Sequence, residues 1–484
     1  MTPDGLRARG ERLCEELGRE SYRTGAGLAA ESHFAEIFAR YPDLADDEAV
    51  AAARAHPALL EWVVDNRVGR AVAALEDRLH AWESRAVVAV AGGETIPYQR
   101  AAIEIANEPH RPRRQAIDAA RRAMLGEPAA IRRERLERER ELLGELGLGD
   151  VVAARSALSG IDLPALGEAC GRFLAATGEL YRASLADALR GEPDIPPREA
   201  DRSDAAFLFR GALFDDCFPG QALLPTAQRQ LVELGLDAAA SGRIHYDTED
   251  RELKRARAFC APVRIPAEVY LVIRPYGGHT DYRAFWHELG HAQHFGNTDA
   301  ALPFEHRWLG DYSVTEGFAM LFEHMVLAAP WLARYAGLRG QRGRRFSRTQ
   351  AFALLAMLRR YAAKLRYELE LHAAPSIAAG AQAYAPLLAE ATGFRYAPED
   401  ALLDLDDGFY AARYLRAWQL EALLASHLTE RFDQDWFRNP RCGPALLELF
   451  ARGQRDDAAQ LARAALGRAL DFAPLVARVE AALG

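Results

Sequence analysis

The sequence predicts a mainly α-helical protein with a small β-sheet next to one functional helix. Three observations support this fold class: apolar residues recur every three or four positions over most of the chain, a β-branched and aromatic stretch interrupts them, and the composition is that of a globular protein. The chain has 484 residues, of which 50% are hydrophobic and 27% are charged. A chain of this length can bury a large core in one or a few domains.

Helices are predicted to follow one another over residues 1–190. Phe34, Ile37, Phe38 and Tyr41 illustrate the helical spacing, and arginine and glutamate fill many of the positions between apolar residues. The stretch at 191–201 is rich in proline and charged residues and is typical of a linker. We therefore expect an N-terminal helical half over residues 1–200 and a second, catalytic helical half over residues 201–484.

Short strands are predicted between about residues 241 and 276. Residues 263–265 and 268–274 are rich in β-branched and aromatic side chains, and prolines bound both segments. They read as one or two strands, and 268–274 is a candidate to bind a peptide backbone as an added strand. The helical pattern resumes after Gly277 and Gly278 and continues to the C-terminus.

The charge and cysteine content exclude several classes of protein. The net charge is −9, which disfavours a nucleic-acid-binding surface. The five cysteines show no CxxC spacing, so neither a disulfide framework nor a cysteine-ligated zinc site is expected. The chain has no apolar signal core at its start and no apolar stretch of about 18 residues. We expect a cytoplasmic protein that binds neither nucleic acid nor membrane; the oligomeric state stays open.

One helical segment contains the sequence His-Glu-Leu-Gly-His, beginning at His287. Thr280 or Asp281 is expected to cap the helix that carries it. Side chains four residues apart lie on one face of a helix, so His287 and His291 can bind the same zinc ion. Glu288 lies beside them, where it can accept a proton from water at the metal.

A zinc site of this kind needs a third protein ligand. Metzincins place a histidine six residues after the second motif histidine, but Asn297 occupies that position. The best candidate is Glu316, which stands 25 residues after His291 in the first turn of another predicted helix, 313–328. The pattern from Ser313 to Glu316 also matches a capping box, in which Glu316 needs no metal. We favour the ligand role because Glu316 accompanies the histidine motif at this distance.

Other residues near the motif are candidates for supporting roles. Glu323 follows Glu316 by two helical turns and could orient a ligand histidine, although a solvated side chain is the alternative. His294 and His279 are candidates for contacts near the metal or with substrate. The pair of glycines at 277 and 278 would allow a peptide to approach the backbone closely.

This set of residues resembles the thimet oligopeptidase and oligoendopeptidase F family of zinc peptidases. That family carries the motif His-Glu-x-Gly-His-x-x-His, followed by a glutamate ligand about 25 residues after the second histidine. His287, Glu288, His291, His294 and Glu316 stand at the matching positions here.

Two further segments extend the resemblance. Residues 245–254 resemble the Asp/Arg/Lys stretch that precedes the active-site strand of the family, and residues 408–418 resemble its C-terminal His/Tyr segment, which stabilises the transition state. Tyr410 and Tyr414 match that segment, whereas Gly408 stands where the family has a histidine. The chain is also shorter than a typical oligopeptidase.

The resemblance implies a neurolysin-like zincin fold, a helical body split by a deep cleft with the metal at its floor. It implies one Zn²⁺ per chain, bound by His287, His291 and Glu316, and a short peptide as substrate. Glu288 is then the general base that activates zinc-bound water, and Tyr414, followed by Tyr410, is the best donor to the oxyanion.

Two other functions stay open. A metallocarboxypeptidase of the carboxypeptidase Taq type also uses a His-Glu-x-x-His motif and a distant glutamate; an arginine in the cleft that binds the terminal carboxylate would indicate it. The other alternative is a non-peptidase metalloprotein or a tailoring enzyme on the same scaffold. The cleavage specificity, the effect of Gly408 and the metal bound in the cell are not determined by the sequence.

Overall fold

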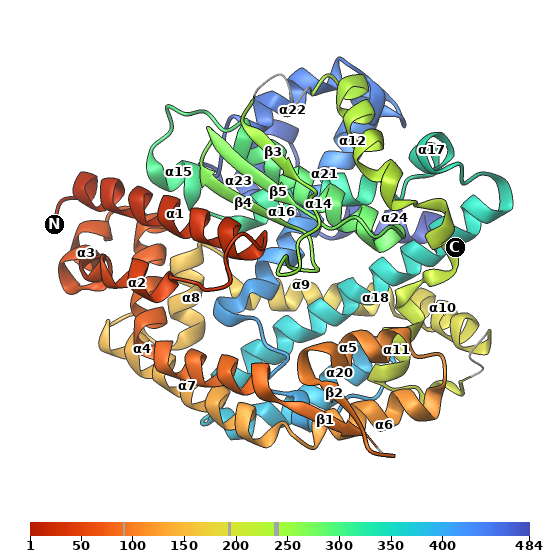
Figure 1. Cartoon of the computed structure of the whole chain (residues 1–484), viewed down its shortest axis with the longest axis horizontal. Coiled ribbons are helices and arrows are strands. Elements are labelled where there is room, and N and C mark those ends of the chain that lie inside the picture. The colour runs from red at the N-terminus through yellow and green to blue at the C-terminus, as the bar shows by residue number, and fades with distance from the viewer. Residues whose placement is uncertain (91, 192–194, 237–241) are drawn as a thin grey trace. The chain divides into compact units, whose positions relative to one another are not determined.

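Helices make up most of the chain, as predicted, and the strands are confined to two short regions (Figure 1). This computed structural model describes residues 1–90, 92–191, 195–236 and 242–484. Residues 192–194 of the predicted linker and residue 241 of the predicted strand region lie outside the described residues. Among the described residues, no helix combines the length and the apolar character needed to cross a membrane.

The helices fall before and after a central sheet. Before it lie α1 (Pro3–Gly25), α2 (Phe34–Ala39), α3 (Asp47–Ala53), α4 (Pro57–Arg85), α5 (Tyr98–Asn107), α6 (Arg111–Arg122), α7 (Gly126–Glu145), α8 (Val151–Ser159), α9 (Leu163–Ala176), α10 (Gly178–Arg190), α11 (Arg202–Arg210) and α12 (Gly220–Leu234). After it lie α14 (His279–Gly296), α15 (Phe304–Trp308), α16 (Tyr312–Met325), α17 (Ala329–Trp331), α18 (Gly340–Ala373), α19 (Ile377–Gly380), α20 (Tyr384–Thr392), α21 (Tyr410–Phe432), α22 (Cys442–Phe450), α23 (Ala458–Leu466) and α24 (Ala473–Leu483).

A β-hairpin interrupts the N-terminal helices, so the prediction of uninterrupted helices over 1–190 is wrong there. Strand β1 (Val87–Val90) pairs antiparallel with β2 (Glu94–Pro97). The buried side chains of Val88, Val90 and Ile96 join a small core with residues of α5 and α6. Four-residue strands are too short for their alternation to stand out among the flanking helical patterns.

The central sheet has three strands, one more than the maximum predicted. They are β3 (Ile244–Asp247), β4 (Phe259–Arg264) and β5 (Glu268–Val272). β5 lies in the middle, parallel to β3 and antiparallel to β4. Because both edges of β5 are already paired, the prediction that 268–274 adds a peptide strand is wrong. Within the described residues β4 is an edge strand, and Pro262 in it is typical of an edge because it lacks an N–H donor.

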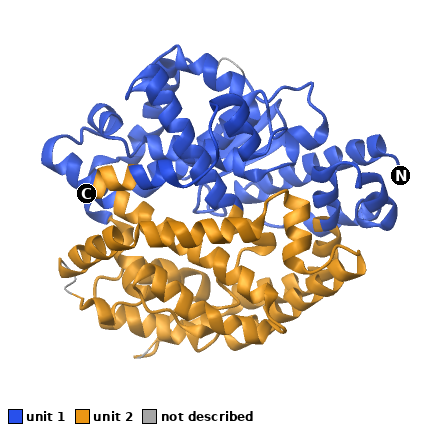
Figure 2. Cartoon of the chain, turned by 180° about the vertical axis from the view of Figure 1, so that it is seen from behind, with its two compact units in different colours: residues 1–64, 212–350, 413–477 blue, residues 65–211, 351–412, 478–484 orange. Residues whose placement is uncertain are grey.

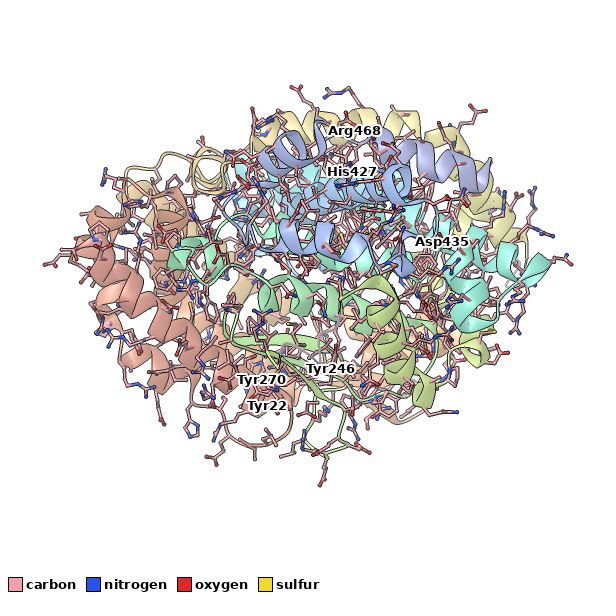
Figure 3. All side chains as sticks on the ribbon, turned by 90° about the horizontal axis from the view of Figure 1, so that it is seen from above. Tyr22, Tyr246, Tyr270, His427, Asp435 and Arg468 are labelled. Carbon is pink, nitrogen blue, oxygen red and sulfur yellow. The ribbon has the colours of Figure 1, made fainter. Side chains whose placement is uncertain are left out.

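Helix α1 packs on this sheet through small residues and one aromatic stack. A side chain at Gly18 would meet the carbonyl oxygen of Pro262, and one at Gly25 would meet the ring of Phe259. The rings of Tyr22 and Tyr270 stack with their centroids 3.7 Å apart, and the two labels lie together in Figure 3. The fit between α1 and β4 therefore depends on glycines that permit close backbone approach.

The segment between β3 and β4 is fixed by a buried ion-pair cluster. Lys254 is buried, and its Nζ donates to Asp247 Oδ1 and to the carbonyl oxygens of Asp247 and Glu249, each at 2.8 Å. Arg251 donates to the same carboxylate at 2.9 Å and to the carbonyl of Ala26. The Asp/Arg/Lys stretch singled out in the sequence thus holds the approach to β4 in place.

The chain divides into two units, each assembled from separate segments (Figure 2). Unit 1 comprises residues 1–64, 212–350 and 413–477, and unit 2 comprises residues 65–211, 351–412 and 478–484. The main core of unit 1 surrounds α14 and α16. Unit 2 has cores of its own around the hairpin and around α18 and α20. The division into domains 1–200 and 201–484 stays a prediction.

Candidate metal centre

Helix α14 carries both motif histidines and is anchored by its apolar side. Phe285, Trp286 and Leu289 are buried in the unit 1 core, which leaves His287 and His291 together on another face. The helix begins at His279 with Gly278 as its N-cap, so the predicted cap at Thr280 or Asp281 is wrong. The Asp281 carboxylate instead accepts a hydrogen bond from the N–H of Gly277 at 2.8 Å.

Helix α16 brings Glu316 to the histidines. Its N-cap is Asp311, whose side chain accepts from the N–H of Ser313, so Ser313 is not the cap that a capping box with Glu316 requires. The two helices cross closely at Gly290, where a Cβ atom would lie 2.6 Å from the Cα atom of Ala319. The capping alternative for Glu316 is therefore not realised, and its carboxylate lies beside α14.

Three ligand atoms converge between these helices. Glu316 Oε2 lies 3.4 Å from His287 Nε2 and 3.7 Å from His291 Nε2, and all three atoms lie within 4.8 Å of one another. Zinc–ligand bonds of about 2.0–2.1 Å at tetrahedral angles separate ligand atoms by roughly 3.3 Å. The donor set and its spacing therefore fit a zinc ion.

The outer nitrogens of the two histidines are held by different groups. His287 Nδ1 lies 2.9 Å from Glu323 Oε2, and His291 Nδ1 lies 2.8 Å from the hydroxyl of Thr315. The other oxygen of Glu323 accepts two hydrogen bonds from Arg283, which also donates to the side chain of Gln350. These contacts orient both rings so that Nε2 of each faces Glu316.

The two imidazoles differ in electrostatic environment. Burial opposes protonation of His287, but its contacts with Glu316 and Glu323 outweigh burial and raise its pKa to about 10. Burial lowers the pKa of His291 to about 4. Burial of Glu323 is likewise outweighed, because Arg283 and His287 hold the pKa of this carboxyl well below its ordinary value. The site thus concentrates negative charge around His287, as a cation site requires.

Glu288 is held beside the cluster by the edge strand. Its Oε2 accepts a hydrogen bond from the backbone N–H of Cys260 in β4 at 2.8 Å. Burial raises the pKa of Glu288 to about 7, against the opposing effects of the His287 charge and the Cys260 N–H. A carboxyl with a pKa near neutrality is suited to accept a proton and return it.

Two other predicted histidines are turned into the core. His294 has no exposed surface, its Nε2 lies 3.2 Å from the carbonyl oxygen of Gly453, and its ring packs against Phe318. His279 is 3% exposed, and its Nδ1 lies 3.0 Å from Asp215 Oδ1. These positions favour packing roles for both residues over contact with a substrate.

The two glycines before α14 leave room for another segment of the same chain. Gly277 has φ +101°, and a Cβ atom there would lie 2.8 Å from the backbone nitrogen of Gly220. Gly278 has φ +90°, and a Cβ atom there would lie 2.9 Å from Asp215. The space that the sequence suggested for a peptide is therefore occupied by the segment that precedes α12.

The two tyrosines of the C-terminal segment belong to different units. Tyr414 lies on α21 in unit 1, half-buried, with its ring centroid 6.1 Å from that of Trp418. Tyr410 belongs to unit 2. Their role as oxyanion donors stays a prediction.

Several supporting residues were not found from the sequence. Arg283 stands one helical turn before His287, and Thr315 directly precedes Glu316, so both were open to inspection once helices were assigned. Asp311 was recognisable as a helix-capping residue type. Cys260 could not be identified from the sequence, because it contacts Glu288 through its backbone N–H and not through its side chain.

Comparison with known proteins identifies similar folds but no matching sequence family. No protein-family model and no curated protein sequence matches the chain. A structure of PZ peptidase A with inhibitor 2 matches with a TM-score of 0.64 and 14% identity, covering 99% of this chain and 86% of the other. A candidate oligoendopeptidase F from Bacillus anthracis str. Ames matches with a TM-score of 0.64 and 14% identity, covering 100% and 84%.

The chain has the fold of these peptidases. The match extends over nearly the whole chain, so the mainly helical fold class predicted from the sequence is confirmed. At 14% identity the likeness concerns the fold alone, and a statement about function has to come from the geometry of the site.

Proposed function

We propose that the protein is a zinc-dependent peptidase that hydrolyses short peptides. The observation that carries this proposal is the set of His287, His291 and Glu316 with Glu288 held beside it by Cys260. A cluster that only bound metal would not need a carboxylate positioned next to it as a base. The likeness in fold to peptidases supports the same conclusion.

His287, His291 and Glu316 are the residues that would hold the zinc. Zinc bound there would act as a Lewis acid and lower the pKa of a coordinated water toward neutrality. Two histidines and one carboxylate leave a further coordination position, as catalytic zinc sites do. Manganese and cobalt accept the same ligands, and metal analysis of the purified protein distinguishes them.

Glu288 is the proposed general base and acid. Its carboxylate accepts a proton from the attacking water and delivers it to the nitrogen of the departing amine. The hydrogen bond from Cys260 occupies Oε2, so Oε1 is the oxygen available for this transfer. Tyr414, and after it Tyr410, are the proposed phenol donors to the oxyanion.

Within the described residues β4 pairs with β5 alone, and its other edge is the proposed platform for the peptide backbone. Its partner β5 lies on one side, and the N–H of Cys260 points to the other side, toward Glu288. An extended peptide added along this edge would place a carbonyl group close to Glu288. This replaces the platform on 268–274 that the sequence suggested.

The proposed compartment is a reducing cytoplasm. All five cysteines are free thiols, which suits that compartment. A carboxypeptidase of the Taq type and a non-peptidase enzyme are the competing functions, and both use the same metal ligands.

The test is mass spectrometry of a mixed peptide library incubated with zinc-loaded protein, with Glu288→Gln in parallel. Loss of the general base should lower cleavage by at least about 100-fold. The variant should retain its zinc, measured by elemental analysis, whereas His291→Ala should lose it. Internal cuts indicate an oligopeptidase, and residues lost only from C-termini indicate a carboxypeptidase. Metal-loaded wild-type protein that cuts nothing would overturn the proposal.

A further inference from the structure

Arg257 forms no hydrogen bond or ion pair with any described residue, whereas the neighbouring cations of its segment do interact. Arg251 and Lys254 bind Asp247, and the guanidinium of Arg255 lies over the ring of Phe259. The side chain of Arg257 is exposed, and within the described residues it forms no hydrogen bond or ion pair. The well-anchored segment therefore exposes the guanidinium of Arg257 to solvent.

Arg257 is close in the chain to the strand residue that contacts the proposed general base. Arg257 precedes Cys260 by three residues, which an extended chain spans in no more than about 11 Å. Cys260 donates to the Glu288 carboxylate. Arg257 therefore lies just before the part of β4 that contacts the proposed general base.

The edge of β4 that faces away from β5 is covered at one end. There the carbonyl oxygen of Pro262 meets α1, which comes so close that only glycine fits at position 18, so a peptide on this edge extends from Cys260 toward the segment that carries Arg257. A peptide that adds to this edge near Cys260 therefore runs past Arg257. A charge at this place is positioned to select among peptides.

We propose that Arg257 binds a carboxylate of the peptide substrate along the β4 edge. The inference rests on the proposed peptidase function and adds a substrate class to it: peptides with a negative charge close to the cleaved bond. A guanidinium is suited to this because its planar fork donates two parallel hydrogen bonds to one carboxylate. The carboxylate is either the C-terminus of the peptide or an aspartate or glutamate side chain.

The experiment compares three peptides that are otherwise matched. The first has a free C-terminus. The second is amidated and has a glutamate beside the cleaved bond, and the third is the same amidated peptide with glutamine in place of that glutamate. kcat/KM is measured for wild type, Arg257→Gln and Arg257→Lys. Arg344→Gln is the matched control, because Arg344 is also exposed and has no partner within the described residues. Wild type should prefer a charged peptide by about tenfold, and Arg257→Gln should abolish that preference.

The conservative variant and salt refine the test. Arg257→Lys keeps the charge but not the fork, so it should retain part of the preference. The preference should shrink as the salt concentration rises. Preference for the free C-terminus identifies the terminal carboxylate, and preference for glutamate identifies a side chain. A wild type without preference, or an Arg257→Gln variant that keeps it, overturns the proposal.

A binding measurement separates this inference from the proposed function. Calorimetric titration of the same peptides into metal-loaded Glu288→Gln protein, with and without Arg257→Gln, reports carboxylate recognition even if wild type cleaves none of them. Tighter binding of the charged peptide that depends on Arg257 supports the inference in that case. Equal binding of all three peptides contradicts it.

Discussion

At the residue scale, the two motif histidines are distinguished by what holds their outer nitrogens. His287 faces the carboxylate of Glu323, which Arg283 keeps charged, whereas His291 faces the neutral hydroxyl of Thr315. A carboxylate partner makes an imidazole a stronger electron donor than a hydroxyl partner does. The two ligands are therefore expected to contribute unequally to metal binding.

We predict that Glu323→Gln weakens zinc affinity by about 10- to 100-fold. The amide preserves the shape of the side chain but removes the charge that faces His287 and pairs with Arg283. Competition with a chromophoric chelator measures the affinity without reference to activity. Thr315→Val is the comparison, and it should weaken zinc binding less. Equal affinities for wild type and Glu323→Gln would contradict the role given to this carboxylate.

The residues of the candidate metal centre were predictable from the sequence, and most of the residues that support them were not. His287, His291 and Glu288 follow from one local pattern, and Glu316 follows from the distance between two helices. Arg283 and Thr315 form no recognisable motif in the sequence. Their contacts with Glu323 and His291 depend on the way in which α14 crosses α16. Arg257 is one among 60 basic residues, nearly all of them arginine, so composition concealed it.

At the element scale, the position of Glu316 depends on how α16 begins. Asp311 is buried and accepts hydrogen bonds from the N–H groups of Ser313 and Ala458. Its carboxylate also meets the guanidinium groups of Arg413 and Arg416 on α21. One side chain thus joins the start of α16, the start of α23 and the first turns of α21.

We predict that Asp311→Ala lowers the free energy of unfolding by about 3 kcal/mol, because it removes a helix cap and leaves buried arginine charge uncompensated. Asp457 provides the matched control: it caps α23 and also contacts Arg416, but its side chain is 35% exposed. Asp457→Ala should cost about 1 kcal/mol. Urea unfolding followed by tryptophan fluorescence measures both. An equal loss in the two variants would refute a special role for burial of Asp311.

The longer elements were predictable because each repeats its pattern over several turns. The hairpin of β1 and β2 and the strand β3 were missed because four residues hold too little alternation to be recognised. The start of α14 was misplaced for another reason. Gly278 has no side chain to signal a cap, and Asp281, which has one, binds the N–H of Gly277.

At the scale of the whole molecule, the proposed metal ligands all belong to unit 1, and unit 2 contains a buried charged cluster of its own. Glu368 on α18 is 1% exposed, and its Oε1 accepts the N–H of Asp406 at 2.8 Å. Its Oε2 is buried and has no hydrogen-bond partner within the described residues. Lys364 forms an ion pair with Asp406, at 2.9 Å.

This arrangement predicts that stability falls as pH rises. Burial raises the pKa of Glu368 to about 8, with Asp406 and Asp404 adding to the effect and Lys364 opposing it. Between the ordinary glutamate pKa and that value, the folded state holds a proton that the unfolded state has released. Its contribution to stability is therefore present at low pH and is lost through about pH 8.

We expect wild type to lose on the order of 2–3 kcal/mol between about pH 6 and 9 relative to Glu368→Gln, whose amide does not titrate. The comparison is made by urea unfolding of both proteins at each pH. Glu390→Gln, at an exposed position on α20, controls for the loss of one charge and should follow the wild-type profile. If Glu368→Gln shows the same pH dependence as wild type, Glu368 does not carry the proton and the prediction is wrong.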